Sequence, residues 1–190
     1  MTAWNAVKLT EARQVVARMG AAPEALPDAA VSVRAGYDDL RAAGTLAEAV
    51  EYLSHALPRA EAVAWAAALI AEEAARIDLP FRNRQALDSA LRWLDAPSDA
   101  NRRSARAAAD LAPRVSPERY LGLAVFYSGG SMAAADAPAV PPPDHACARF
   151  AVGAIEQAAY RSPPADRLFL RALALGEDVA VRGLAALDPS

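Results

Sequence analysis

The chain has 190 residues, a length that favours one domain with a hydrophobic core of its own. Hydrophobic residues make up 54% of it and charged residues 23%, which is typical of a globular protein and excludes a disordered one. The formal net charge of -3 argues against a protein that binds nucleic acid by neutralising phosphates. The single cysteine, Cys147, excludes an internal disulfide and favours a reducing compartment.

The sequence predicts a soluble cytoplasmic protein. Its first residues contain no basic segment followed by a long apolar run, so we expect no secretory signal. The longest uncharged apolar run, residues 62–71, is about half as long as a membrane span must be, so we expect no membrane span. We expect residues 1–190 to form a single helical domain whose two ends, 1–9 and 186–190, are frayed.

Abundant alanine, leucine, arginine and glutamate, with few β-branched residues, predict an all-α fold. In the first part of the chain, Gly20 and Gly44 are placed to end helices. Thr45, with Glu48 three residues later, matches a capping box at the start of the next helix. The helices expected here are 10–19, 36–43 and 45–57.

The helix that follows is the predicted centre of the fold. Pro58 ends the preceding helix and can begin this one, which we expect to reach about residue 77. Because it is apolar all round, other helices should surround it and Trp65 should lie in the core. Further helices are expected at 83–94 and 98–112, the second capped by Ser98 and lined on its inner face almost entirely by alanine.

The last third of the chain contains more helix starts. Ser116-Pro117-Glu118 combines a cap, a proline at the first helical position and an acid in the first turn. We expect a short tail helix after Gly176, and the other helices of this part at 120–127, 144–160 and from Pro163-Pro164 to 175. Short connections imply antiparallel neighbours. The sequence thus predicts an all-α, single-domain stack of antiparallel helical hairpins with about eight or nine helices.

Known catalytic motifs are missing from this sequence. There is no nucleophile elbow, zinc-protease helix or phosphate-binding loop of the usual spacing, so we assign no catalytic residue, no metal and no cofactor. His145 and Cys147 are two residues apart and do not share a helix face. A Cys–His nucleophile pair stays open because such partners meet only in space, but we interpret Cys147 as a small buried apolar residue.

The joint between the helices at 45–57 and 58–77 carries the candidate functional cluster Glu51, His55, Arg59 and Glu61. His55 follows Glu51 by one turn on the expected polar side of its helix. The pair could be a general base oriented by a carboxylate, or an exposed pair near a helix end that favours the charged imidazole. Arg59 and Glu61 begin the next helix, so we expect a structural, hydrogen-bonded corner.

The loop 128–143 is the candidate interaction segment. Its Ser-Gly-Gly-Ser start follows a helix C-terminus, whose dipole disfavours anions, so we interpret the glycines as a helix cap and not as a phosphate cradle. Since Asp136 is its only charge, we expect the loop to lie on apolar helix surface, with serines capping freed carbonyls. Met132 and Val140 are the expected anchors. The candidate residues are Ser128, Gly129, Gly130, Ser131, Met132, Val140, Pro141, Pro142 and Pro143.

Residues 51–66, and 126–131 with the proline run, resemble an uncharacterised bacterial family of small helical proteins. Its members pair a His-Ala-Leu-Pro joint with a Ser-Gly-Gly-Ser loop and a proline-rich segment, and the resemblance extends from about residue 44. The chain departs from this pattern at Ala64, where an aromatic residue is usual, and in its alanines after Met132. The resemblance assigns no catalytic residue. It implies a cytoplasmic accessory or cargo-handling role in type VI secretion gene neighbourhoods.

Two classes of function follow. The first is a non-enzymatic protein-interaction module, an adaptor, chaperone-like or immunity-type protein whose partner is another protein. The alternative is a small enzyme or ligand-binding protein that uses Glu51, His55 and Arg59. A pocket that converges on His55 and Arg59 favours the second class, and an exposed apolar groove favours the first.

Overall fold

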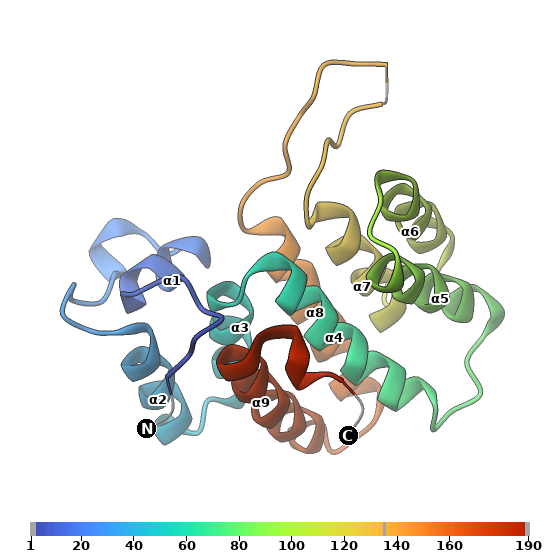
Figure 1. The fold of residues 1–190 in the computed structure, drawn as a ribbon. Helices are drawn as coiled ribbons and strands as arrows, with labels where there is room; N and C mark the ends of the chain where they lie inside the picture. The colour runs from blue at the N-terminus through green and yellow to red at the C-terminus, as the bar shows by residue number, and fades with distance from the viewer. Residues whose placement is uncertain (1–2, 135, 189–190) are drawn as a thin grey trace.

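The computed structural model describes residues 3–134 and 136–188, and it confirms the all-α prediction (Figure 1). Within these residues there are nine α-helices and no β-strand, only an isolated bridge between Glu11 and Ser32. The helices are α1 Ala12–Arg18, α2 Val33–Ala43, α3 Leu46–Ala56, α4 Arg59–Ala74, α5 Phe81–Asp95, α6 Asp99–Leu111, α7 Pro117–Tyr127, α8 Ala146–Arg161 and α9 Ala165–Arg182. Two short 3₁₀ turns, Pro23–Ala25 and Gly183–Ala186, complete the secondary structure of this part of the chain.

Helix α4 runs through the middle of the molecule, as its apolar sequence predicts (Figure 1). It packs against α5, α7, α8 and α9, so it has neighbours on several sides. Every residue from Ala62 to Ala67 is buried, and so are Leu69 and Ile70. Trp65 is fully buried, and its indole N–H donates a hydrogen bond of 2.9 Å to the carbonyl oxygen of Ala172 in α9.

The remaining helices form two groups around this centre. Helices α1, α2 and α3 lie at one end of the molecule, and α5, α6 and α7 lie at the other (Figure 1). The inner face of α6 is built from alanine, with Ala105 and Ala109 fully buried. A Cβ atom on Gly122 of α7 would lie 2.9 Å from the Ala105 carbonyl oxygen and 2.9 Å from the Ala109 Cβ. Small residues therefore let these two helices approach closely, as expected from the sequence.

All three predicted helix starts are found, at Thr45, Ser98 and Ser116, but the predicted side-chain cap forms at only two of them. The Ser98 hydroxyl accepts a hydrogen bond from the backbone N–H of Asn101, and that of Ser116 accepts one from Arg119. The capping box expected at Thr45 does not form, because its hydroxyl donates to the Leu40 carbonyl at the end of α2. Gly44, at φ 75°, connects α2 and α3 in a turn so tight that the Thr45 hydroxyl bonds to the end of α2 and not to the start of α3.

The break expected at Gly176 is also wrong, since α9 continues through this residue to Arg182. A Cβ atom at Gly176 would lie 2.5 Å from Leu53 Cδ2 and 3.0 Å from Trp65 Cε2. The missing side chain allows α9 to pack against α3 and against Trp65 of α4. This glycine is therefore a packing residue, and its weak helix propensity is overridden by tertiary contacts.

The structure describes most of the two terminal segments that were expected to fray. Residues 1–2 and 189–190, part of the segments expected to fray, lie outside the described residues. From residue 3 onward the chain packs on the body: the backbone N–H of Ala6 donates to the Ala180 carbonyl at 3.0 Å. The Trp4 ring meets the Tyr37 ring edge-on at 5.0 Å between centroids. Near the other end, Leu187 packs against the core.

Replacing Gly176 with alanine should destabilise the protein, although alanine is normally the better helix former. Overpacking costs about 1–3 kcal/mol, which outweighs the gain of about 1 kcal/mol in helix propensity. We expect Gly176→Ala to lower the free energy of unfolding by up to about 2 kcal/mol in urea denaturation. In a Leu53→Ala background the same change should cost less, because the new methyl group then has room. An equal cost in both backgrounds would contradict the packing role.

Candidate functional site

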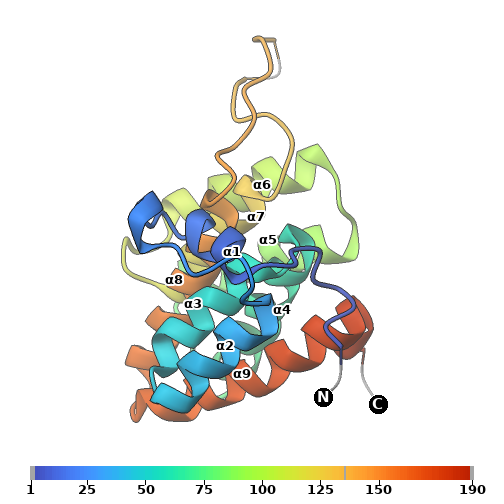
Figure 2. The same ribbon diagram turned by 90° about the vertical axis from the view of Figure 1, so that its left-hand side faces the viewer.

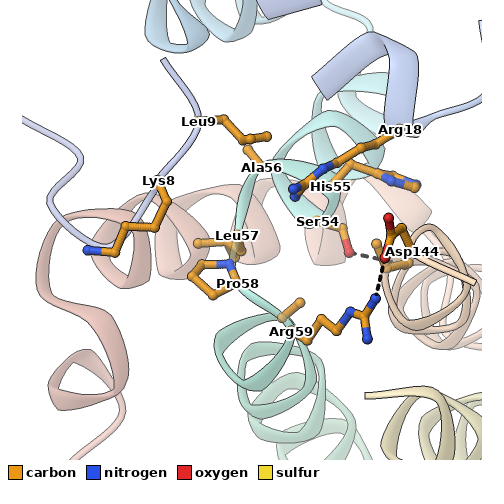
Figure 3. A pocket seen from close by; sticks show the side chains of 12 residues that line it. Lys8, Leu9, Arg18, Ser54, His55, Ala56, Leu57, Pro58, Arg59 and Asp144 are labelled. Atoms are coloured by element: carbon orange, nitrogen blue, oxygen red, sulfur yellow. Dashed lines mark hydrogen bonds and ion pairs between the residues drawn. The ribbon is translucent and has the colours of Figure 1, made fainter. Parts of the chain in front are cut away.

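A pocket of about 290 Å³ lies at the joint between α3 and α4 (Figure 3). The two helices are connected only by Leu57 and Pro58, both with extended backbones. The α1 end, the N-terminal segment and the start of α8 complete the walls. The lining residues are Lys8, Leu9, Arg18, Ser54, His55, Ala56, Leu57, Pro58, Arg59, Ala62, Asp144 and Ala148.

His55 is buried, which corrects the expectation that it lies on a polar helix side. Only 2% of its surface is exposed, because α3 is covered by α1, α2, α8 and α9. Neither ring nitrogen has a hydrogen-bond partner among the residues that the structure describes. Burial, followed by the charges of Arg149, His145 and Arg18, lowers the pKa of His55 to about 4. The imidazole is therefore neutral at pH 7, and the prediction that the helix end favours its charged form is wrong.

The structure brings only two members of the predicted cluster into this pocket. Arg59 is half-buried, and its Nη2 donates to the Asp144 Oδ1 at 2.8 Å. Glu51 and Glu61 do not line the pocket. Glu51 instead lies near Glu156, whose pKa is raised by burial and by the charge of Glu51. The alternative of a histidine base oriented by Glu51 is thus not formed: the two ring nitrogens of His55 are unpartnered within the described residues.

The sequence reasoning missed Lys8, Arg18 and Asp144. These residues come from the N-terminal segment, the end of α1 and the turn before α8, all far along the chain from His55. No local spacing signals that they meet. Together with Arg59 they give the pocket three cationic side chains and one carboxylate.

Cys147 occupies the place expected for a small apolar residue. It is a free, fully buried cysteine, and burial raises the pKa of its thiol to about 12. Its Sγ lies 3.7 Å from the Arg59 carbonyl oxygen. A thiol whose pKa is raised this far stays protonated at pH 7, so it is unsuited to nucleophilic chemistry.

The loop 128–143 projects from the helical body in both views, between the ends of α7 and α8 (Figures 1 and 2). The expectation that it lies on apolar helix surface is therefore wrong. Val140, an expected anchor, is 46% exposed, whereas Met132 is partly buried near the base. Of the three consecutive prolines, Pro142 is buried while Pro141 and Pro143 are exposed.

Polar contacts hold the base of this loop. The guanidinium of Arg102, a residue only 3% exposed, donates to the Phe126 carbonyl at 2.7 Å and to the Ser131 carbonyl at 2.8 Å. Arg103 donates to the Ala133 carbonyl at 2.8 Å. These bonds from α6 satisfy carbonyl groups at the end of α7 and in the loop. Apolar contacts, which the composition of the loop led us to expect, would have left these carbonyls without hydrogen bonds.

The two serines have different roles at the base. The Ser128 hydroxyl donates to the Val125 carbonyl at 2.8 Å, which confirms the predicted cap. Ser131 does not cap a carbonyl: its Oγ accepts from the backbone N–H groups of Ala133 and Val140. A further bond of 2.8 Å, from Met132 N–H to the Val140 carbonyl, closes the loop at its neck.

Gly130 is needed for this arrangement. Its φ is +66°, and a Cβ atom there would lie 2.9 Å from the Arg102 guanidinium nitrogens. The glycine thus allows both the turn and the close approach of Arg102. The predicted role of this glycine pair as the turn that ends α7 agrees with this geometry.

A second hollow, of about 400 Å³, lies between α1, α2 and α3. Its walls are mostly apolar and include Val16, Met19, Val31 and Leu40. The pocket at His55 and Arg59, expected of an enzyme or ligand-binding protein, and an apolar groove, expected of an interaction module, are therefore both present.

Both quoted motifs, the joint at residues 51–66 and the loop start at 126–131, lie within the match to a known family. The sequence model of a family of unknown function, DUF6931, matches residues 37–180. The chain belongs to the DUF6931 family. No curated protein and no solved structure was found to match it.

In residues 3–134 and 136–188 no helix is long and apolar enough to span a bilayer. In the same residues no three histidine, cysteine or acidic side chains are grouped so that they could hold a metal ion.

The buried histidine makes stability depend on pH. The unfolded chain binds a proton at His55 near pH 6.5, whereas the folded protein resists protonation down to about pH 4. The free energy of unfolding is therefore unaffected by His55 above pH 6.5. It decreases as the pH falls below 6.5, because the unfolded chain then binds a proton at His55 that the folded protein does not. We expect the free energy of unfolding to fall by about 2 kcal/mol between pH 7 and pH 5 through this residue. His55→Gln should remove that part of the slope, while His145→Gln, at an exposed site, should keep it. Equal slopes for wild type and His55→Gln, measured by denaturation at each pH, would contradict the burial of a neutral imidazole.

Proposed function

We propose that this protein is a non-enzymatic interaction module that binds another protein through the loop 128–143. The observation that supports it best is that the loop stands clear of the helices while its base is fixed by Arg102 and Arg103 (Figure 2). A segment held in this way is accessible to a partner on both sides.

The composition of the loop fits this role. Its described outer part, residue 134 and residues 136–141, is exposed and carries Asp136 as its one charge. Apolar surface exposed in this way is stabilised when a partner covers it. Prolines at 138 and 141–143 restrict the unbound backbone, so binding loses little conformational entropy.

The cellular setting is part of the same proposal. The resemblance to bacterial proteins of type VI secretion neighbourhoods supports a cytoplasmic accessory, adaptor or chaperone-like role. Partners captured from the native cell would test it: secretion-system components support the role, and their absence among the specific partners contradicts it. The catalytic alternative keeps a pocket at His55 and Arg59 but has no carboxylate to orient the histidine there, because Glu51 does not line that pocket.

Replacement of Ala133–Val140 by a Gly/Ser linker of equal length should weaken binding of the captured partner at least tenfold, because it removes the apolar contacts and the restricted backbone. The melting temperature should change by no more than about 2 °C, since these residues contribute little to the core. Affinity capture with mass spectrometry identifies the partner, and titration with the purified partner measures the change.

The matched control replaces residues 22–25, a connection whose residues are all exposed, with a Gly/Ser linker of equal length. This variant should bind the partner as the wild type does. If the loop variant binds as tightly as the control, the loop is not the interface and the proposal fails.

A further inference from the structure

The pocket at the α3–α4 joint plays no part in the binding proposed for the loop 128–143. None of the side chains that line the pocket comes from that loop. Its charged groups are unbalanced. Lys8, Arg18 and Arg59 line it, against the single carboxylate of Asp144. Figure 3 shows that Arg18 and Arg59 reach it from different helices, with Lys8 at the far rim. A neutral His55 leaves this excess of positive charge unchanged.

The one carboxylate neutralises little of this charge. Asp144 is bonded to Arg59, but its side chain is 90% exposed. An ion pair so open to water contributes little stability and is readily exchanged for another anion. The Arg59 side chain is only 34% exposed, and its guanidinium is therefore a donor that a ligand can take over from Asp144.

Two helix starts border the same space. Arg59 and Ala62 belong to the first turn of α4, and Ala148 belongs to the first turn of α8. Among the residues described, no side chain caps the N-terminus of either helix, and each helix has 16 residues. Unbonded N–H groups and the helix dipole both favour an anion at such a position.

His55 supplies an independent indication of a ligand. It lines the pocket, is 98% buried, and carries a ring N–H and a ring nitrogen that lack partners within the described chain. A buried polar group without a hydrogen bond is destabilising. A ligand oxygen in the pocket would accept the N–H of this imidazole.

The rest of the wall is apolar. Leu9, Leu57 and Pro58 face the space beside the charged groups, which leaves room for the carbon part of a small molecule. We propose that this pocket binds a small organic anion, whose phosphate or carboxylate group is held by Arg59, Arg18 and the start of α4 and whose apolar part lies against Leu9 and Leu57.

The test uses phenyl phosphate and benzoate as probes, with benzyl alcohol as the uncharged control, on the purified full-length protein. Calorimetric titration at pH 7 and low salt should detect at least one anion and no benzyl alcohol. A preference between the two anions identifies the head group, and either preference supports the proposal.

Two variants of one ion pair should change the affinity in opposite directions. Arg59→Gln should weaken binding about tenfold or more, because a charge-assisted hydrogen bond is lost. Asp144→Asn should strengthen it several-fold, because it frees Arg59 for the ligand. Arg114→Gln, at an exposed position outside the pocket, is the matched control and should leave the affinity unchanged. Circular dichroism melts verify that each variant is folded.

Nuclear magnetic resonance locates the site: the anion should shift the ring nitrogen signals of His55 and the amide signals of residues 58–62, and leave those of α6 in place. No binding of either anion at 10 mM, equal binding of benzyl alcohol, or weaker binding by both Arg59→Gln and Asp144→Asn would overturn the proposal. Because no partner protein is present, these results are independent of the loop proposal.

Discussion

Helix α4 can be stable in water only when other helices cover all of its faces, and this requirement organises the molecule. An apolar stripe on one side would need one neighbour, but α4 has buried residues at nearly every position from Ala62 to Ile70. Helices α5, α7, α8 and α9 supply the cover. They approach closely because alanine and glycine stand at the contacts, as Gly176 does beside Trp65.

The central position of α4 has a consequence for chemistry. Burial of the helix begins at Ala62, and the end of α3 that leads into it is buried under α1, α2, α8 and α9, so His55 is neutral there. The pocket forms where the polar start of a buried helix meets basic side chains from α1 and the N-terminal segment. The loop is held in a different way: Arg102, buried in α6, binds one carbonyl at the end of α7 and one in the α7–α8 connection, and the rest of the loop projects. A rigid helical body thus presents two separate features for binding.

Local signals in the sequence predicted most of the helices, because proline, glycine and capping serine act within a few residues. The errors arose where distant contacts decide. Gly176 looked like a break, yet packing against Leu53 and Trp65 keeps α9 continuous. His55 looked exposed from the periodicity of α3, which cannot reveal that four helices surround it. The loop composition suggested docking on a surface, but arginines of a helix about 30 residues away fix its base. Arg18 could not be joined to Arg59 because nothing in the local sequence relates α1 to α4.

Native-state hydrogen exchange tests most directly whether burial of α4 holds the fold together. The amides of residues 63–70 should exchange only through complete unfolding, so their opening free energy should equal the free energy of unfolding from denaturant titration. Amides of α1 and of the outer helix α6 should open at lower free energy, because each is covered on fewer sides. Exchange of residues 63–70 at a free energy below that of α6 would contradict the central role of α4.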